Sequence, residues 1–197
     1  MISVIIITKN RPTLQRAIDS INNQTIKDVE LIVEHCADNL SCGEIAFNKT
    51  KLLNNITSEW VTFLDDDDYW YPTFLEECTS HSNMDVIIVN NQYQLTGPIG
   101  NIGAILSIGQ SVSPGSCIIY KTSAIKNVNG FNHKMGFNAP YELMVKLYAN
   151  NYKFHHIPKP LVYVEHQQND NIGFIDIEFY NQLKIRTEIL NNYDLNK

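Results

Sequence analysis

Unbroken apolar runs alternate with amphipathic segments through the first ninety residues of the chain. Residues 2–8 form a mostly β-branched run, which is typical of a strand buried on both of its faces. Pro12 follows, and apolar residues then recur at helical spacing up to Ile21, which predicts a helix. The same reasoning predicts strands at 2–8, 29–33, 60–64 and 85–89, with helices between them at 12–21, 44–55 and 72–81. This alternation indicates a parallel sheet with right-handed crossovers.

The second half of the chain has a less regular pattern. Strands are expected at 116–120, 154–157 and 161–164, and helices after Thr122, at 140–150 and at 175–191. Residues 96–115 contain five glycines and two prolines, so we interpret them as a mobile loop that is either a lid over an active site or disordered. No linker or internal repeat divides the chain. We therefore expect one α/β domain over residues 1–197, in which a mostly parallel central sheet is flanked by helices.

Four consecutive aspartates follow the third predicted strand, in the segment FLDDDDYWYP. Adjacent carboxylates repel one another, and a divalent cation such as Mn²⁺ or Mg²⁺ removes that cost because it prefers oxygen ligands. Alternate side chains of an extended chain point to the same side, so Asp65 and Asp67 are expected to face one cavity. Ligands of parallel sheets bind at the carboxyl ends of the strands, where Thr8 and Glu34 are also expected. We interpret Asp68 as a cap of the following helix.

Two longer segments carry a resemblance to a known family. SVIIITKNRPTLQRAIDSINNQTIKDVELIV and EWVTFLDDDDYWYPTFLE together resemble a family-2 glycosyltransferase with the GT-A fold, which is Rossmann-like and binds nucleotides. The resemblance covers residues 1–90 and continues more weakly from NGFNHKM to IPKPLVYVEH. It implies a donor half over 1–90 and an acceptor half over 91–197. It also implies metal-dependent transfer of a sugar from a nucleotide-diphosphate donor, with a UDP-sugar favoured, to a hydroxyl of a carbohydrate or glycoconjugate acceptor.

The resemblance also implies which residues form the site. In the family, the end of the first strand holds the nucleotide, and an acid after the second strand binds the uracil or ribose. The residues implied to bind the donor are Thr8, Asn10, Arg11, Glu34, Asn48, Asp65 and Asp66. The residues implied to hold Mn²⁺ or Mg²⁺ are Asp65, Asp67 and His166.

The sequence departs from the family pattern at the catalytic base. The family has an acid at the start of the helix before L-x-x-x-L, whereas this chain has Ala139 and Pro140 there. An inverting transfer needs a base within reach of the acceptor hydroxyl, and proline cannot accept a proton. Glu142, two residues further on, and His133, on the preceding loop, are the candidate bases. Alternatively the reaction is retaining, or the protein binds nucleotide sugars and has lost or weak catalysis.

Three aromatic residues follow the aspartates, and aromatic faces bind sugars as well as packing into cores. We expect one of Tyr69, Trp70 and Tyr71 to line the acceptor site. A nucleotidyltransferase, which also uses paired acids on an α/β sheet, is less favoured. The reason is that KNRP lacks the glycines of a phosphate-binding loop.

Composition narrows the list of partners and compartments. The chain has 15 basic and 21 acidic residues and no basic run, so we expect no nucleic-acid partner. No apolar run approaches the length of a membrane span, so no transmembrane segment is expected. The four cysteines form no C-x-x-C pair and are interpreted as reduced thiols of a cytoplasmic protein.

Overall fold

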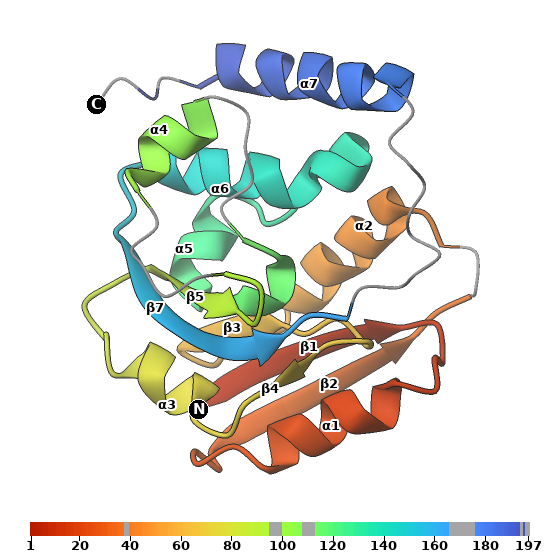
Figure 1. Ribbon diagram of the computed structural model, residues 1–197, viewed down its shortest axis with the longest axis vertical. Coiled ribbons are helices and arrows are strands. Elements are labelled where there is room, and N and C mark those ends of the chain that lie inside the picture. Colours follow the sequence, from red (N-terminus) through yellow and green to blue (C-terminus); the bar gives the residue numbers. More distant parts are fainter. Residues whose placement is uncertain (38–39, 95–99, 108–112, 166–175, 194, 196–197) are drawn as a thin grey trace.

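The computed structural model describes residues 1–37, 40–94, 100–107, 113–165, 176–193 and 195 (Figure 1). Its strands are β1 (Ile2–Thr8), β2 (Val29–His35), β3 (Trp60–Phe63), β4 (Tyr69–Trp70), β5 (Val86–Asn91), β6 (Ile118–Lys121) and β7 (Phe154–Tyr163). Its helices are α1 (Leu14–Asn22), α2 (Cys42–Leu53), α3 (Phe74–Thr79), α4 (Ile102–Ser107), α5 (Thr122–Asn127), α6 (Ala139–Ala149) and α7 (Asp176–Asn191). Two 3₁₀ segments, η1 (Gly115–Cys117) and η2 (His133–Asn138), complete the described elements.

The strands form a seven-stranded sheet in the order β2-β1-β3-β6-β5-β7-β4. The long pairings of β1 with β2 and of β5 with β7 are parallel, as is the pairing of β1 with β3. The antiparallel pairings are short: β6 lies between β3 and β5, and β4 pairs with the end of β7. The predicted α/β class with a mostly parallel sheet is confirmed.

Helices cover both faces of the sheet (Figure 1). Strand β1 shows why, because its alternate side chains enter two different hydrophobic clusters. Val4 and Ile6 pack in the cluster that includes α1 and α3, whereas Ile5 packs in the cluster with α2, α5 and α6. All three side chains are fully buried. The β-branched run seen in the sequence is therefore the middle layer of three.

Three local features differ from the sequence predictions. The two strands expected at 154–157 and 161–164 are one strand, β7, whose register against β5 shifts between Val89 and Asn90. Pro158 and Pro160 lie at this irregularity, where a proline removes no regular ladder hydrogen bond. The two-residue strand β4 was not predicted, and part of the expected loop 96–115 forms α4. Residues 95–99 and 108–112 of that loop lie outside the described residues.

None of the helices in the described ranges is long and apolar enough to cross a membrane.

Candidate functional site

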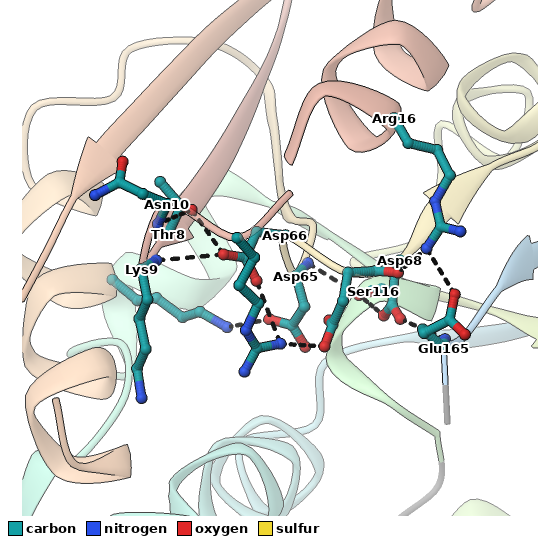
Figure 2. A network of polar contacts seen from close by, with 12 residues as sticks. Thr8, Lys9, Asn10, Arg16, Asp65, Asp66, Asp68, Ser116 and Glu165 are labelled. Atoms are coloured by element: carbon teal, nitrogen blue, oxygen red, sulfur yellow. Dashed lines mark hydrogen bonds and ion pairs between the residues drawn. The ribbon is translucent and has the colours of Figure 1, made fainter. Parts of the chain in front are cut away.

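The four aspartates form the loop between β3 and β4, which we call the acid loop (residues 65–68). Strand β3 lies beside β1, and the backbone N–H of Leu64 donates to the carbonyl of Ile5 at 3.1 Å. The acid loop then turns at once, because the N–H of Asp68 donates to the carbonyl of Asp65 at 3.1 Å. After this tight turn the four carboxylates have different surroundings, and Figure 2 labels three of them, Asp65, Asp66 and Asp68.

Asp66 ties the acid loop to the end of β1. Its side chain is buried, and Oδ2 accepts a hydrogen bond from the hydroxyl of Thr8 at 2.6 Å and one from the N–H of Lys9 at 3.3 Å. Thr8 is itself fully buried, so this contact lies beneath the surface of the site. The sheet geometry thus brings the ends of two parallel strands together, as the sequence predicted.

Arg11 reaches the acid loop from the turn after β1. The preceding residue, Asn10, has a backbone φ of 58°, a left-handed conformation that asparagine tolerates better than most residues. The guanidinium of Arg11 donates to Oδ2 of Asp67 and lies 3.5 Å from Oδ1 of Asp66. One basic side chain therefore lies beside two neighbouring acids.

Lys49 approaches the same loop from α2, a helix that begins with a capping box between Ser41 and Glu44. Its ammonium lies 3.3 Å from Oδ1 of Asp65 and sits over the rings of Phe63 at 5.4 Å and Phe131 at 5.8 Å. Only 12% of the Lys49 side chain is exposed. A cation with so little water contact depends on its carboxylate and aromatic partners.

Asp68 is buried on the opposite side of the loop, with 3% of its surface exposed. The hydroxyl of Ser116 donates to its Oδ2, and the backbone N–H of Glu165 donates to its Oδ1 at 3.0 Å. The same Ser116 oxygen accepts the N–H of Asp65 at 3.1 Å. Burial, followed by the charge of Asp65, raises the pKa of Asp68 to about 7. Asp68 therefore joins the acid loop to η1 and to the chain after β7.

The interpretation of Asp68 as a helix cap is wrong. Helix α3 begins six residues later at Phe74, and its N-cap residue is Thr73. The hydroxyl of Ser116 and the N–H of Glu165 are donors that lie far away in the sequence, and they draw the Asp68 side chain inward.

Arg16 of α1 contacts the outer side of the acid loop (Figure 2). Its Nη2 donates to the carbonyl of Asp67 at 2.6 Å and to the carboxylate of Glu165 at 2.8 Å. Its guanidinium also lies over the ring of Tyr69 at 5.1 Å and over that of Tyr163 at 5.8 Å. Arg16 thus helps to hold the backbone of Asp67 in place.

A cavity of about 740 Å³ opens in front of the acid loop, a size that suits a small-molecule ligand. Its charged lining includes Lys9, Arg11, Lys49, Asp65, Asp66 and Asp67. The other wall is formed by residues of η2 and α6, among them Phe137, Pro140 and Tyr141, and by Arg186 of α7. The cavity lining therefore combines acidic and basic side chains from the acid loop, the end of β1 and α2 with mainly apolar groups from η2 and α6.

No protein-family model matches the sequence, and no curated protein matches it. TarS of S. aureus superposes with a TM-score of 0.72 at 15% identity, over 98% of this chain and 40% of that chain. The 1-349 part of TarS in complex with UDP-GlcNAc gives 0.68 at 16% identity, over 98% and 67%. The mannosyltransferase PcManGT from Pyrobaculum calidifontis, in complex with GDP-Man and Mn²⁺, gives 0.70 at 14% identity, over 98% and 64%.

The chain has a GT-A-like fold. The fold that the sequence resemblance implied is thereby confirmed. The chain spans about two fifths of the TarS chain, so the likeness concerns that part alone.

In this GT-A-like fold, the residues implied to bind the donor divide into two groups. Arg11, Asp65 and Asp66 line the cavity. The remaining four are Thr8, Asn10, Glu34 and Asn48, and none of them is among the described residues that line it. Thr8 supports Asp66, and Oδ1 of Asn10 lies 2.6 Å from Nδ1 of His35. Nδ2 of Asn48 donates to Sγ of Cys36, which does line the cavity, at 3.4 Å.

Two of the three residues implied to bind a metal are among the described residues. Asp65 and Asp67 both face the cavity, whereas His166 lies outside the described residues. Within the described ranges, no group of three or more His, Cys, Asp and Glu side chains is arranged to hold a metal ion. Two carboxylates nevertheless suit Mn²⁺ or Mg²⁺, because Mg²⁺ commonly takes one or two carboxylates together with substrate phosphates. The donor set therefore fits such an ion once Arg11 and Lys49 leave the two acids.

Neither candidate base is brought to this cavity. Glu142 is buried in α6, where its carboxylate lies 3.1 Å from Nζ of Lys146 and accepts a hydrogen bond from the hydroxyl of Tyr193 at 3.0 Å. His133 lines a second, smaller cavity of about 520 Å³, and its ring centroid lies 5.8 Å from that of Phe47. Ala139 and Pro140, which stand where the resemblance places the family's acid, both line the main cavity.

The aromatic residues after the acid loop pack away from the main cavity. Tyr69 stacks on Tyr163 and Trp70 stacks on Phe74, and the ring N–H of Trp70 donates to the carbonyl of Ser116 at 2.8 Å. Neither these two nor Tyr71 is among the described residues that line the cavity. The structure does not place the acceptor site, so the expectation that one of them lines it stays a prediction.

Replacing Asp68 by asparagine should change how stability depends on pH. The folded protein holds a proton on Asp68 up to about pH 7, whereas the unfolded chain releases it near the ordinary value of 3.8. Between these values the folded state binds more protons, so this group makes the unfolding free energy fall as pH rises, by at most about 1.4 kcal/mol per pH unit. Asp68→Asn should remove this contribution.

The measurement is urea unfolding at several pH values from 4 to 7 in the presence of a chelator, for the wild type and Asp68→Asn. The exposed residue Asp19, changed to asparagine, is the matched control. If Asp68→Asn keeps the wild-type slope, the proton is not held on Asp68.

Proposed function

We propose that the protein is a metal-dependent glycosyltransferase that uses a nucleotide-sugar donor. The observation that carries the proposal is the acid loop, which stands at the carboxyl edge of a GT-A-like sheet and faces a cavity of about 740 Å³. PcManGT, of similar fold, is a mannosyltransferase that was solved with GDP-Man and Mn²⁺, and TarS was solved with UDP-GlcNAc. We favour a UDP-sugar as the donor, a hexose as the transferred sugar and a carbohydrate hydroxyl as the acceptor.

In this proposal Asp65 and Asp67 hold Mn²⁺ or Mg²⁺, with His166 as a further ligand. A divalent ion would neutralise the donor diphosphate and stabilise the leaving group. Asp66, held by Thr8 and Lys9, keeps the acid loop next to the end of β1, where the nucleotide is proposed to bind. Residues 1–90 form the donor half in this proposal, and residues 91–197 form the acceptor half of a single domain.

The second candidate function is nucleotide-sugar binding with lost or weak catalysis. It is favoured by Pro140, which lines the cavity at the position of the family's base. Among the described lining residues, carboxylates come from the acid loop alone. Glu142 and His133 remain the candidate bases of the first proposal, and the structure holds Glu142 in a buried ion pair.

One experiment separates the two candidates. The protein is incubated with Mn²⁺ and a panel of UDP- and GDP-sugars, and the release of free nucleotide is followed with and without carbohydrate acceptors. Release that needs the protein and the metal supports the transferase. Donor binding without turnover across many acceptors supports the binding protein, and the absence of donor binding contradicts both.

A further inference from the structure

We propose that Arg11 and Lys49 exchange partners when the donor binds: they leave Asp67 and Asp65 for the donor diphosphate as the metal takes the two carboxylates. Binding of the metal then raises the affinity for the nucleotide, and binding of the nucleotide raises the affinity for the metal. This mutual effect comes from the exchange of partners and adds to that of any direct contact between the two ligands. This inference rests on the proposed function and assigns Lys49, which the family resemblance did not point to, as a phosphate-binding residue.

The position of Lys49 is the first observation that supports the exchange. Its ammonium is held by one carboxylate, that of Asp65, and by the faces of Phe63 and Phe131. Half of the Asp65 side chain is exposed to solvent, whereas only 12% of the Lys49 side chain is exposed. Lys49 is therefore anchored by its surroundings while its partner is open to the cavity. When Asp65 changes partner, Lys49 stays at the cavity wall with an unpaired charge.

Arg11 forms the second pair, with Asp67 and more distantly with Asp66. About a third of its side chain is exposed, and it lines the same cavity as Lys49. A guanidinium matches phosphate oxygens through two parallel N–H groups, and it can reach them by rotating about its side-chain bonds. Asp66 remains hydrogen-bonded to Thr8, so it stays in place when Arg11 moves.

The charges explain why one ligand favours the other. A metal ion that binds alone must displace two basic side chains from their acids and then lies beside them. A diphosphate that binds alone meets carboxylates that still hold these bases. When both bind, Asp65 and Asp67 pair with the metal, and Arg11 and Lys49 pair with the phosphates, so each of these four side chains has a partner of opposite charge.

Isothermal titration calorimetry with Mn²⁺ and UDP as probes tests this exchange. The coupling factor is the ratio of UDP affinity with Mn²⁺ to UDP affinity without it. We expect a factor of roughly ten or more for the wild type. In Lys49→Met, Mn²⁺ alone should bind more tightly and UDP more weakly, and the coupling factor should fall severalfold. Arg11→Met, at a more exposed position, should behave in the same way.

Lys51→Met is the matched control, because Lys51 is an exposed lysine of the same helix that borders the smaller cavity. It makes the same change in net charge and should leave the coupling factor unchanged. If Lys49 and Arg11 simply stay on their acids, both variants shift the separate affinities and leave the coupling factor at the wild-type value. That result overturns the exchange while UDP binding is retained. If UDP binds neither with nor without Mn²⁺, the proposed function fails and the exchange fails with it.

Discussion

Replacing Asp67 by alanine is expected to lower donor turnover by roughly 10²–10³-fold, the range found when a single group that stabilises developing charge is removed. Asp67 faces the cavity with 15% of its side chain exposed, and its carboxylate pairs with Arg11. In the proposed function it is also a metal ligand. Its loss would therefore remove a ligand from the site and leave the Arg11 guanidinium without its nearest carboxylate. The measurement is the initial rate of nucleotide release in Mn²⁺ with saturating donor.

The control for this change is Asp19→Ala. Asp19 is an exposed aspartate of α1 that accepts a hydrogen bond from Gln15 at 2.8 Å, away from the cavity. The Asp19→Ala variant should release nucleotide at the wild-type rate. Both variants should unfold at similar urea concentrations, because the backbone of Asp67 is still held by Arg16. Should Asp67→Ala retain half or more of the wild-type turnover, Asp67 cannot be a ligand that the reaction needs.

The sequence predicted the sheet well where hydrophobic pattern alone decides the structure. Residues 2–8 are apolar on both sides, so they had to lie in the middle layer, and β1 does. The same pattern placed the acids at the carboxyl edge, where Asp66 meets Thr8. The sequence predicted two strands on either side of Pro158 and Pro160, whereas β7 is one strand whose register shift against β5 accommodates the prolines.

The partners of the acid loop could not be predicted, because they come from distant parts of the chain. From the sequence alone, four adjacent acids are expected to need an external cation. The structure instead has Lys49 beside Asp65, Arg11 beside Asp67 and two neutral donors around Asp68. No periodicity or spacing indicates that Ser116 and Glu165 meet Asp68, since they are 48 and 97 residues away.

Replacing Lys146 by methionine is expected to destabilise the protein by about 3–5 kcal/mol. Lys146 and Glu142 form an ion pair at 3.1 Å within α6, and their side chains are 11% and 6% exposed. Without Lys146, the carboxylate of Glu142 keeps the hydroxyl of Tyr193 as a donor but loses its counter-charge in a buried place. Urea unfolding measures the change. Lys51→Met, which removes an exposed lysine, should cost far less.

The double variant Glu142→Gln/Lys146→Met decides whether this loss comes from the unpaired charge. It should recover most of the lost stability, because no buried charge is then left alone. A double variant as unstable as Lys146→Met would mean that packing of the lysine stem, and not its charge, carries the effect.

The same pair also tests the role of Glu142 in catalysis. Glu142→Gln removes a proton acceptor and keeps the shape of the side chain. If Glu142 serves the ion pair, its removal should lower stability and leave the turnover of the folded protein close to the wild-type rate. If Glu142 is instead the catalytic base, Glu142→Gln should cause a large loss of turnover and leave the stability nearly unchanged. The geometry favours the first result, since the Glu142 carboxylate is engaged by Lys146 and Tyr193 and the cavity wall at this end of α6 is formed by Pro140 and Tyr141.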